Sequence, residues 1–177
     1  MKFYDVNVSL GGYPFRHIPR HTAAEVREDL ENMGCMGALA VNNGSLLYAD
    51  TRQANLELVE MIADHTGFFY GCATVNPTWP KAEEELDEFV DQYGFKAMRL
   101  LPMFHKYQLM EAEKLVRYAA SRKIPVLIPQ EIVDYRQQTL WEPREQLPYD
   151  DMLELAKAVP EATIIWLFGG FDDQAPA

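Results

Sequence analysis

Short apolar runs alternate along the chain with segments in which apolar residues recur every three or four positions. Six runs have the length and the branched or aromatic residues of β-strands, and five segments have the periodicity of amphipathic helices. The expected strands are Phe3–Leu10, Met36–Val41, Phe68–Val75, Phe95–Leu101, Ile124–Pro129 and Thr163–Phe168. This order predicts an α/β fold with a parallel sheet, whose functional groups lie at the carboxyl ends of the strands.

The expected helices begin and end at recognisable signals. Thr22, with Glu25 three residues later, forms a capping-box pattern at the first helix, which Gly34 ends. The others are expected after Asp50 or Thr51, after Pro80, from Leu109 to Ala119 and from Asp150 to Val159. No linker or internal repeat divides the chain, so we expect residues 1–177 to form one domain.

The first expected strand has one apolar and one polar face. Its even positions from Tyr4 to Leu10 are apolar, whereas its odd positions are Asp5, Asn7 and Ser9. Such a strand lines either the inner wall of a (β/α) barrel near its mouth or a solvent-exposed sheet edge. We favour the barrel wall, because an exposed antiparallel edge fits poorly with the alternation of strands and helices.

The barrel-wall interpretation places Asp5 deep on the inward face. An unpaired buried carboxylate is costly, so Asp5 would need a partner there. We expect that partner to be Arg99, Lys96 or a set of backbone N–H groups.

Composition excludes several classes of function. Lys and Arg number 16 and Asp and Glu number 27, so the formal net charge is 16 − 27 = −11, which argues against binding of nucleic acid. No basic leader precedes an apolar run, and no apolar run is long enough to span a membrane, so we expect a cytoplasmic protein. Cys35 and Cys72 are far apart and have no metal-ligand spacing, which indicates reduced core thiols.

Six short motifs extend over nearly the whole chain. They are Tyr4–Gly11, Ala54–Leu58, Ala73–Pro77, Gly94–Pro102, Glu131–Arg136 and Leu167–Gly170. In this order and spacing they resemble the amidohydrolase-related branch of the amidohydrolase superfamily. The resemblance implies a TIM-barrel-like (β/α) fold and the activity of a metal-dependent hydrolase, or of a non-oxidative decarboxylase of aromatic or unsaturated acids.

The resemblance also implies a metal centre, but the residues at its ligand positions differ in type. The family places His-x-His at the end of strand one, a Lys or Glu on strand four of two-metal members, and histidines on strands five and six. The corresponding residues here are Asn7, Ser9, Arg99, Gln130 and either Leu167 or Phe168. The strand-eight aspartate lies beyond Ala177. Neutral amides and hydroxyls are poor Zn²⁺ ligands, so we expect no cofactor, with a divalent metal such as zinc as the alternative.

The four histidines offer a different set of donors. His17, His21 and His105 are expected near the open end of the barrel, where they form a possible metal trio, although surface histidines are the default. His105 alone fits a ligand-binding or acid–base group in the loop after strand four. His65 closes the second helix at the opposite end, where it complements the helix dipole.

Further polar residues follow other strands at the same end. Asn42 and Asn76 end the second and third strands, and both also lie in turn-forming sequences. Asp134 and Arg136 follow the fifth strand, where they also fit a loop ion pair, and Arg16 fits a bidentate clamp for a carboxylate. The candidate substrate-binding set is Asn7, Ser9, Arg16, Asn42, Asn76, Arg99, His105, Gln130, Asp134 and Arg136. No residue type in this pattern identifies a catalytic group.

Two functions therefore fit the sequence. The first is a hydrolase or decarboxylase of a small carboxylate-bearing substrate, as the resemblance implies. The second is a metal-free, non-catalytic homologue, a pseudoenzyme that binds a small molecule or serves as an interaction subunit.

The number of strands bears on assembly. A complete (β/α)8 barrel takes about 250 residues, and the chain has six expected strands, so we expect the last two β-α units to be missing. The outer strands would then have unpaired edges, which a smaller barrel, the C-terminal tail or a second chain can cover. We expect a homo-oligomer, with Trp166, Leu167 and Phe168 near the contact.

Overall fold

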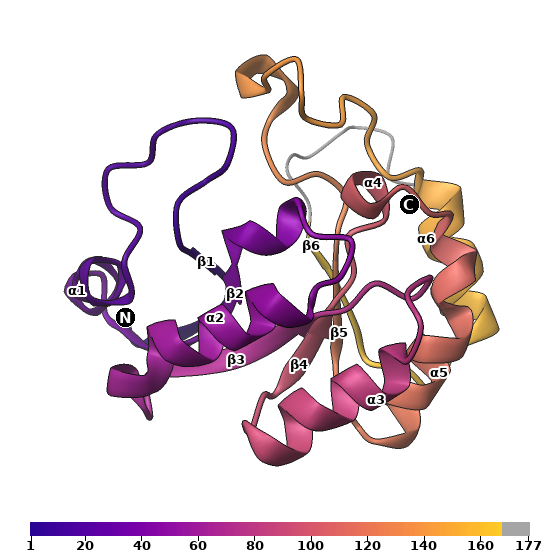
Figure 1. The fold of residues 1–177 in the computed structure, drawn as a ribbon, viewed down its shortest axis with the longest axis horizontal. Helices are drawn as coiled ribbons and strands as arrows, with labels where there is room; N and C mark the ends of the chain where they lie inside the picture. The colour runs from indigo at the N-terminus through magenta and orange to yellow at the C-terminus, as the bar shows by residue number, and fades with distance from the viewer. Residues whose placement is uncertain (168–177) are drawn as a thin grey trace.

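The six expected strands form one parallel sheet in the order in which they occur along the chain (Figure 1). This computed structural model describes residues 1–167, apart from the side chain of Tyr135. The strands are β1 (Phe3–Leu10), β2 (Cys35–Asn42), β3 (Phe69–Thr74), β4 (Ala97–Arg99), β5 (Val126–Pro129) and β6 (Ile164–Leu167). The prediction of an α/β fold with six parallel strands is confirmed, and Phe168, the expected last strand residue, lies outside the described residues.

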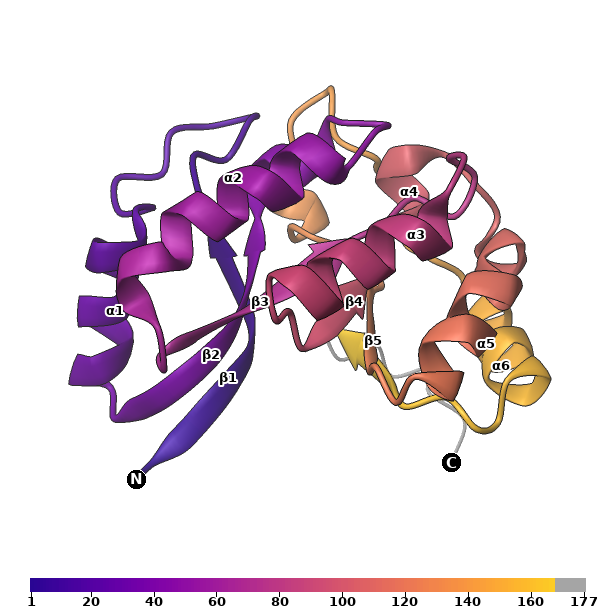
Figure 2. The same ribbon diagram turned by 60° about the horizontal axis from the view of Figure 1, so that its bottom comes forward.

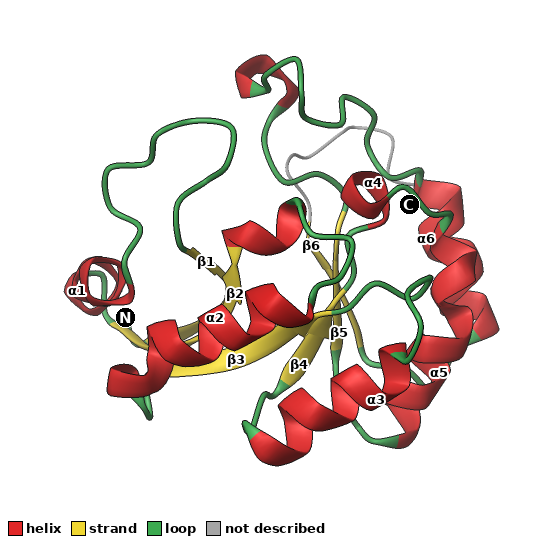
Figure 3. Cartoon of the chain, viewed as in Figure 1, coloured by secondary structure: helices red, strands yellow, loops and turns green. Residues whose placement is uncertain are grey.

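Helices follow the strands where the sequence predicts them (Figure 3). They are α1 (Ala23–Asn32), α2 (Arg52–Ile62), α3 (Ala82–Asp87), α5 (Glu113–Ser121) and α6 (Tyr149–Ala158). A further one-turn helix, α4 (Pro102–His105), follows β4. Thr22 caps α1 in the expected capping box with Glu25. No helix within residues 1–167 combines the length and the apolar character needed to cross a membrane.

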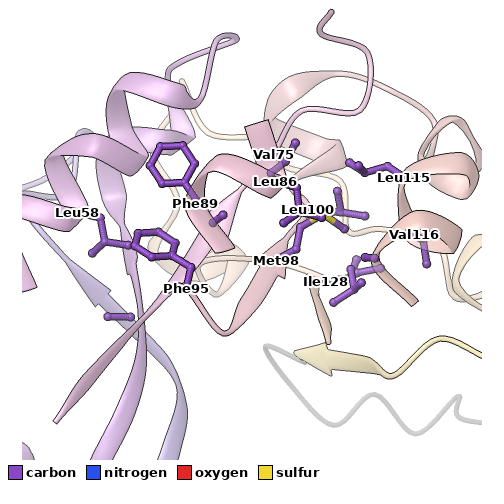
Figure 4. Close-up of a cluster of buried hydrophobic side chains, with 14 of the residues drawn as sticks. Leu58, Val75, Leu86, Phe89, Phe95, Met98, Leu100, Leu115, Val116 and Ile128 are labelled. Atoms are coloured by element: carbon purple, nitrogen blue, oxygen red, sulfur yellow. The ribbon is translucent and has the colours of Figure 1, made fainter. Parts of the chain in front are cut away.

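The sheet is curled into a half-barrel with helices along its outer side (Figure 2). The larger core lies between this outer face and the helices, and it contains Leu58 of α2 and Leu115 of α5 together with Met98 and Ile128 of the sheet (Figure 4). A smaller apolar cluster covers the inner face. It comprises Val41, Cys72, Ala97 and Leu127, with Leu39, Ile165 and Leu167 at its margin. Within the described residues, β1 and β6 pair with one neighbour each.

The strict alternation expected for β1 is wrong in its first half. The register with β2 shifts on both sides of Asp5, and Asp5 pairs with Ala38, which belongs to the helix-facing core. A bulge moves the following side chains to the other face, because faces alternate with every residue. Consequently Tyr4 and Val6 are 61% and 40% exposed, and only Val8 and Leu10 are buried as expected.

The bulge also overturns the predicted environment of Asp5. Its side chain is half-buried, and one carboxylate oxygen accepts the backbone N–H of Asn7 at 2.9 Å. Arg99 is fully buried and bonds elsewhere, and Lys96 is exposed. Of the predicted partners, Arg99 and Lys96 are therefore wrong, and a backbone N–H group is present. Asp5 needs no distant cation, because its side chain is only half-buried.

Gly71 in β3 leaves room for an aromatic ring. A Cβ atom there would lie 2.3 Å from Cδ1 of Phe95, a buried residue two positions before β4. We predict that Gly71→Ala lowers the free energy of unfolding by about 1–3 kcal/mol through overpacking. Urea denaturation measures the change. Gly12→Ala is the control, because no heavy atom lies within 4 Å of that Cβ position, and equal losses in both variants would contradict the prediction.

Candidate functional site at the carboxyl end of the sheet

A buried polar cluster lies where β2, β3 and β4 end. Arg99 is the last residue of β4, and its guanidinium donates from Nη2 to Oγ of Ser45 at 2.8 Å and from Nε to Oγ1 of Thr74 at 3.3 Å. Ser45 belongs to the helical turn after β2, and Thr74 ends β3. The Thr74 hydroxyl donates to Oγ of Ser45 at 3.2 Å, which in turn donates to the carbonyl of Asn42 at 2.6 Å.

The charge of Arg99 has no negative partner within residues 1–167. Its side chain is 2% exposed, and its described hydrogen bonds go to neutral hydroxyl groups. Burial lowers the pKa of the guanidinium to about 10, and burial raises the pKa of the neighbouring Cys72 thiol to about 12, so this thiol is neutral. The cluster is therefore a buried cationic site.

His105, at the end of α4, borders the same cluster. Its Nε2 lies 2.8 Å from the carbonyl oxygen of Ser45. Burial is the main cause that holds the pKa of the ring below its ordinary value, and the charge of Arg99 adds to the effect. His105 is therefore neutral at pH 7.

A second set of hydrogen bonds fixes Thr74 from the outer side of the sheet. The Asn55 side chain of α2 accepts the Thr74 N–H at 2.9 Å and donates to the Thr74 carbonyl at 2.8 Å. Glu85 of α3 accepts from the same Asn55 amide at 3.0 Å and from the Thr51 hydroxyl at 2.9 Å. Helices α2 and α3 thus hold the end of β3, and through it a hydrogen-bond partner of Arg99.

The loop between β1 and α1 and the loop between β5 and α6 lie over this end of the sheet. An apolar cluster to which both loops contribute forms a roof over the polar site. Tyr13, Leu46 and Leu101 are buried in one apolar cluster, with Phe15, Ile18, Phe104, Ile132 and Val133 packed against them. Leu46 adjoins Ser45, and Leu101 follows Arg99 by two residues, so the cluster covers the polar site. The roof excludes water from the surroundings of the guanidinium.

The loops are joined to each other by buried polar contacts. The hydroxyl of Tyr13 donates to Oε1 of Glu142, and the backbone N–H of Thr139 donates to Oε2 of Glu142 at 2.6 Å. Burial, followed by the hydrogen bond to Glu142, raises the pKa of Tyr13. Arg16 lies over the Tyr13 ring, with Cζ 5.7 Å from its centroid, and donates to Gln137 at 3.1 Å.

Two hollows border the roof. One of about 10 Å³ lies between the loops after β4 and β5, where Leu101, Phe104, Gln130, Ile132 and Glu142 are among its lining residues. The other, of about 350 Å³, lies within the first loop. Its lining includes Tyr13, Arg16, His17 and His21.

Several other candidate residues make contacts within turns or loops, and Asn42 and Asn76 also donate to the carbonyls of Ala54 and Ala49. Asn42 caps the turn after β2 by accepting the Gly44 N–H at 2.8 Å, and Asn76 accepts the Thr78 N–H at 3.1 Å. Asp134 accepts the backbone N–H of Arg136 at 2.9 Å and its guanidinium at 2.6 Å, which lowers the pKa of Asp134 to about 2. The structure therefore contains the turn contacts of Asn42 and Asn76 and the ion pair of Asp134 with Arg136 that the sequence allowed.

Residues 10–162 match a family model described as Amidohydrolase. The chain belongs to the amidohydrolase family. No curated protein matches it significantly.

The fold of this chain is similar to three solved structures. The first is 2,6-dihydroxybenzoate decarboxylase from Rhizobium, with a TM-score of 0.67 and 14% identity, covering 93% of this chain and 65% of that one. The second is a proposed amidohydrolase from Staphylococcus aureus, with a TM-score of 0.65 and 15% identity, covering 94% of this chain and 67% of that one. The third is 2,6-dihydroxybenzoate decarboxylase in complex with 2,6-dihydroxybenzoate, with a TM-score of 0.60 and 16% identity, covering 80% of this chain and 54% of that one. The chain therefore spans less than two thirds of the first structure's length.

The described residues do not fit the metal centre of the family. Asn7 and Ser9 are exposed neutral groups, Gln130 donates its amide to the Leu147 carbonyl at 3.4 Å, and Leu167 is apolar. Within residues 1–167, no group of three or more His, Cys, Asp or Glu side chains converges, so the trio His17, His21 and His105 is not brought together. The position of Phe168 lies outside the described residues.

Sequence reasoning missed several members of the cluster. Ser45 lies outside the six motifs, and Thr74 lies in one of them, Ala73–Pro77, but was not a candidate; the fold alone brings both to Arg99. Glu142, which bonds to Tyr13, also lies outside the motifs. The sequence did indicate a role for Asn55, because its amide side chain lies between the buried residues Ala54 and Leu58 on the inward side of α2. Such a polar residue at a core position indicates a buried hydrogen-bond requirement.

Glu85 makes stability depend on pH. Burial outweighs its two hydrogen bonds and raises the pKa of the carboxyl from 4.5 to about 7. The folded protein binds the extra proton between these values, so the stabilisation is complete below pH 4.5 and is lost as pH rises through 7. The loss amounts to about 3 kcal/mol, because each pKa unit corresponds to about 1.4 kcal/mol.

We predict that Glu85→Gln flattens this pH dependence, since the amide oxygen still accepts both hydrogen bonds. Urea denaturation at pH 5, 6, 7 and 8 measures it. Glu84→Gln, at an exposed position paired with Lys81, is the control and should keep the native slope. An unchanged slope in Glu85→Gln would contradict the assignment.

Proposed function

We propose that this chain is a metal-free member of the amidohydrolase family that binds a small carboxylate-bearing molecule at Arg99. The observation that carries the proposal is the burial of the Arg99 charge without an anion among residues 1–167. Buried charges in proteins are paired, because an isolated ion loses its hydration without compensation. A bound anion would supply the missing charge.

The geometry of the guanidinium favours a carboxylate as that anion. Ser45 and Thr74 hold Nη2 and Nε, so the planar group is fixed before a ligand arrives. A carboxylate matches this planar donor group with two oxygens. The similar decarboxylase is named for an aromatic carboxylate, and the apolar roof suits a ligand of that kind.

A metal-dependent hydrolase or decarboxylase is the second candidate, which membership of the family favours. Its metal ion would need donors other than the amides and hydroxyl at the family's positions.

Replacement of Arg99 tests the proposal. We predict that benzoate raises the melting temperature of the native protein and binds in calorimetry, and that Arg99→Met weakens binding by about 10- to 100-fold, as expected for loss of a charged hydrogen bond. The benzoate affinity of Arg99→Lys should fall between those of the native protein and Arg99→Met, because lysine keeps the charge without the planar group. Arg117→Met, at an exposed position of α5, should bind normally. Equal binding by native protein and Arg99→Met would refute the proposal.

Metal content separates the two candidates. We predict that freshly purified protein holds much less than one equivalent of zinc or manganese by mass spectrometry, and that added Zn²⁺ leaves benzoate binding unchanged. Stoichiometric metal, or turnover that depends on it, would favour the metal-dependent enzyme.

We also propose self-association through the edge at β6. Within the described residues this apolar strand pairs with β5, and Trp166 and Leu167 are half-buried. An uncovered apolar edge promotes pairing with another chain. Light scattering at low micromolar concentration should give the mass of a dimer or larger species. A monomer with a cooperative thermal transition would contradict this proposal.

A further inference from the structure

The hollow within the first loop differs in charge from the chain as a whole. The chain has 27 Asp and Glu residues against 16 Lys and Arg, yet none of the described residues that line this hollow is acidic. Its polar lining residues are Tyr13, Arg16, His17 and His21. A ligand in this first-loop hollow therefore meets one permanent positive charge and two imidazole rings.

Neutral groups hold the guanidinium of Arg16. Its Cζ lies 5.7 Å from the centroid of the Tyr13 ring, and Nη1 donates to Oε1 of Gln137 at 3.1 Å. Within the described part of the chain Arg16 forms no ion pair, whereas Arg20 pairs with two carboxylates of α1. Glu142 does not line the first-loop hollow, and its oxygens accept from Tyr13 and from a backbone N–H group. The charge of Arg16 is therefore open to an anion.

The hydrogen bond of His21 determines how its ring can contact an anion. Nδ1 lies 2.9 Å from the carbonyl oxygen of Ile18, which can only accept, so Nδ1 carries a proton. No hydrogen bond within residues 1–167 uses Nε2 of this ring. Nε2 donates to a ligand only when the ring is cationic, so an anion at Nε2 and the second proton of the ring stabilise each other.

These donors fit a phosphoryl group better than a carboxylate. Arg16 and a cationic His21 supply two positive charges, and a phosphoryl group carries a charge of about −1.5 to −2 at pH 7. Its oxygens accept hydrogen bonds from several directions, and a guanidinium binds two of them side by side. The volume of about 350 Å³ is in the range of sites for small molecules.

We propose that the first-loop hollow binds a phosphoryl group, with Arg16 and a cationic His21 as its main donors and His17 as a third. The group belongs either to inorganic phosphate or to a small phosphate ester, whose body would contact Phe15 and Ile18 of the same lining. Arg99 is not among the lining residues, so the inference does not depend on the proposed binding of a carboxylate.

Calorimetry with inorganic phosphate and with phenyl phosphate, at an ionic strength fixed with sodium chloride, tests the proposal. Arg16→Met should weaken the binding of both by about 10- to 100-fold, as expected for loss of charged hydrogen bonds. Arg20→Met removes the same charge from the same loop but outside the lining, so it should change the affinity by no more than about twofold. Circular dichroism checks that each variant is folded.

His21→Asn isolates the contribution of Nε2. The asparagine amide can still donate to the Ile18 carbonyl, but it has no atom in the place of Nε2. Sulfate keeps two negative charges between pH 6 and pH 8, so it reports the charge of the protein. Native protein should bind sulfate more tightly at pH 6 than at pH 8, and His21→Asn should reduce this difference.

Other charged or titratable groups surround the hollow. Hydrogen bonds from Thr22 lower the pKa of Glu25, which accepts the His21 N–H, and burial raises the pKa of Tyr13. Hydrogen bonds outweigh burial and lower the pKa of Glu142. Neither these groups nor Arg16 and Arg20 change charge between pH 6 and pH 8, so His17→Asn is measured beside His21→Asn to divide the effect between the two rings.

The two ligands identify the source of the phosphoryl group. Tighter binding of phenyl phosphate than of phosphate would indicate an ester, and binding of phosphate at least as tight would indicate the free ion. Absence of saturable binding of both ligands, equal binding by native protein and Arg16→Met, or an equal loss in Arg20→Met would overturn the site. Sulfate binding with the same pH dependence in His21→Asn would overturn the role of His21. Phosphate binding that persists in Arg99→Met keeps this inference separate from the proposed function.

Discussion

The burial of a positive charge at the end of β4 is the constraint on which the arrangement of the site depends. Arg99 cannot leave water without polar neighbours, and its described neighbours come from two other strand ends. Ser45 is placed by the turn that Asn42 caps, and Thr74 is placed by the amide of Asn55. One guanidinium thus ties the ends of β2, β3 and β4 to the helices behind them.

The apolar roof determines how strongly the charge of Arg99 interacts with other charges. Tyr13, Leu46 and Leu101 replace water with apolar groups above the cluster, and attraction between charges grows as the local dielectric constant falls. The same apolar cover raises the cost of the free guanidinium. The site therefore combines a large cost when it has no anion with a large gain when an anion is present.

The sequence predicted regular elements better than contacts. Periodicity located the strands and the main helices, because burial on one face leaves a repeating pattern that each element carries by itself. The bulge beside Asp5 left no such pattern, since the residue types in β1 still alternate although the register shifts. Arg99 was recognised as a candidate, but its partners could not be, because Ser45 and Thr74 become neighbours only when the sheet has formed.

The bond between Tyr13 and Glu142 joins residues 129 positions apart in the sequence. Contacts of such separation form late in folding, because a long intervening loop must first be closed. The pairing of β1 with β2 joins residues closer in sequence, such as Phe3 and Cys35, and closes a shorter loop. During synthesis the ribosome must pass residue 142 before the first loop has its partner. The contact between the two loops above Arg99 therefore requires a longer loop to close than any pairing of neighbouring strands.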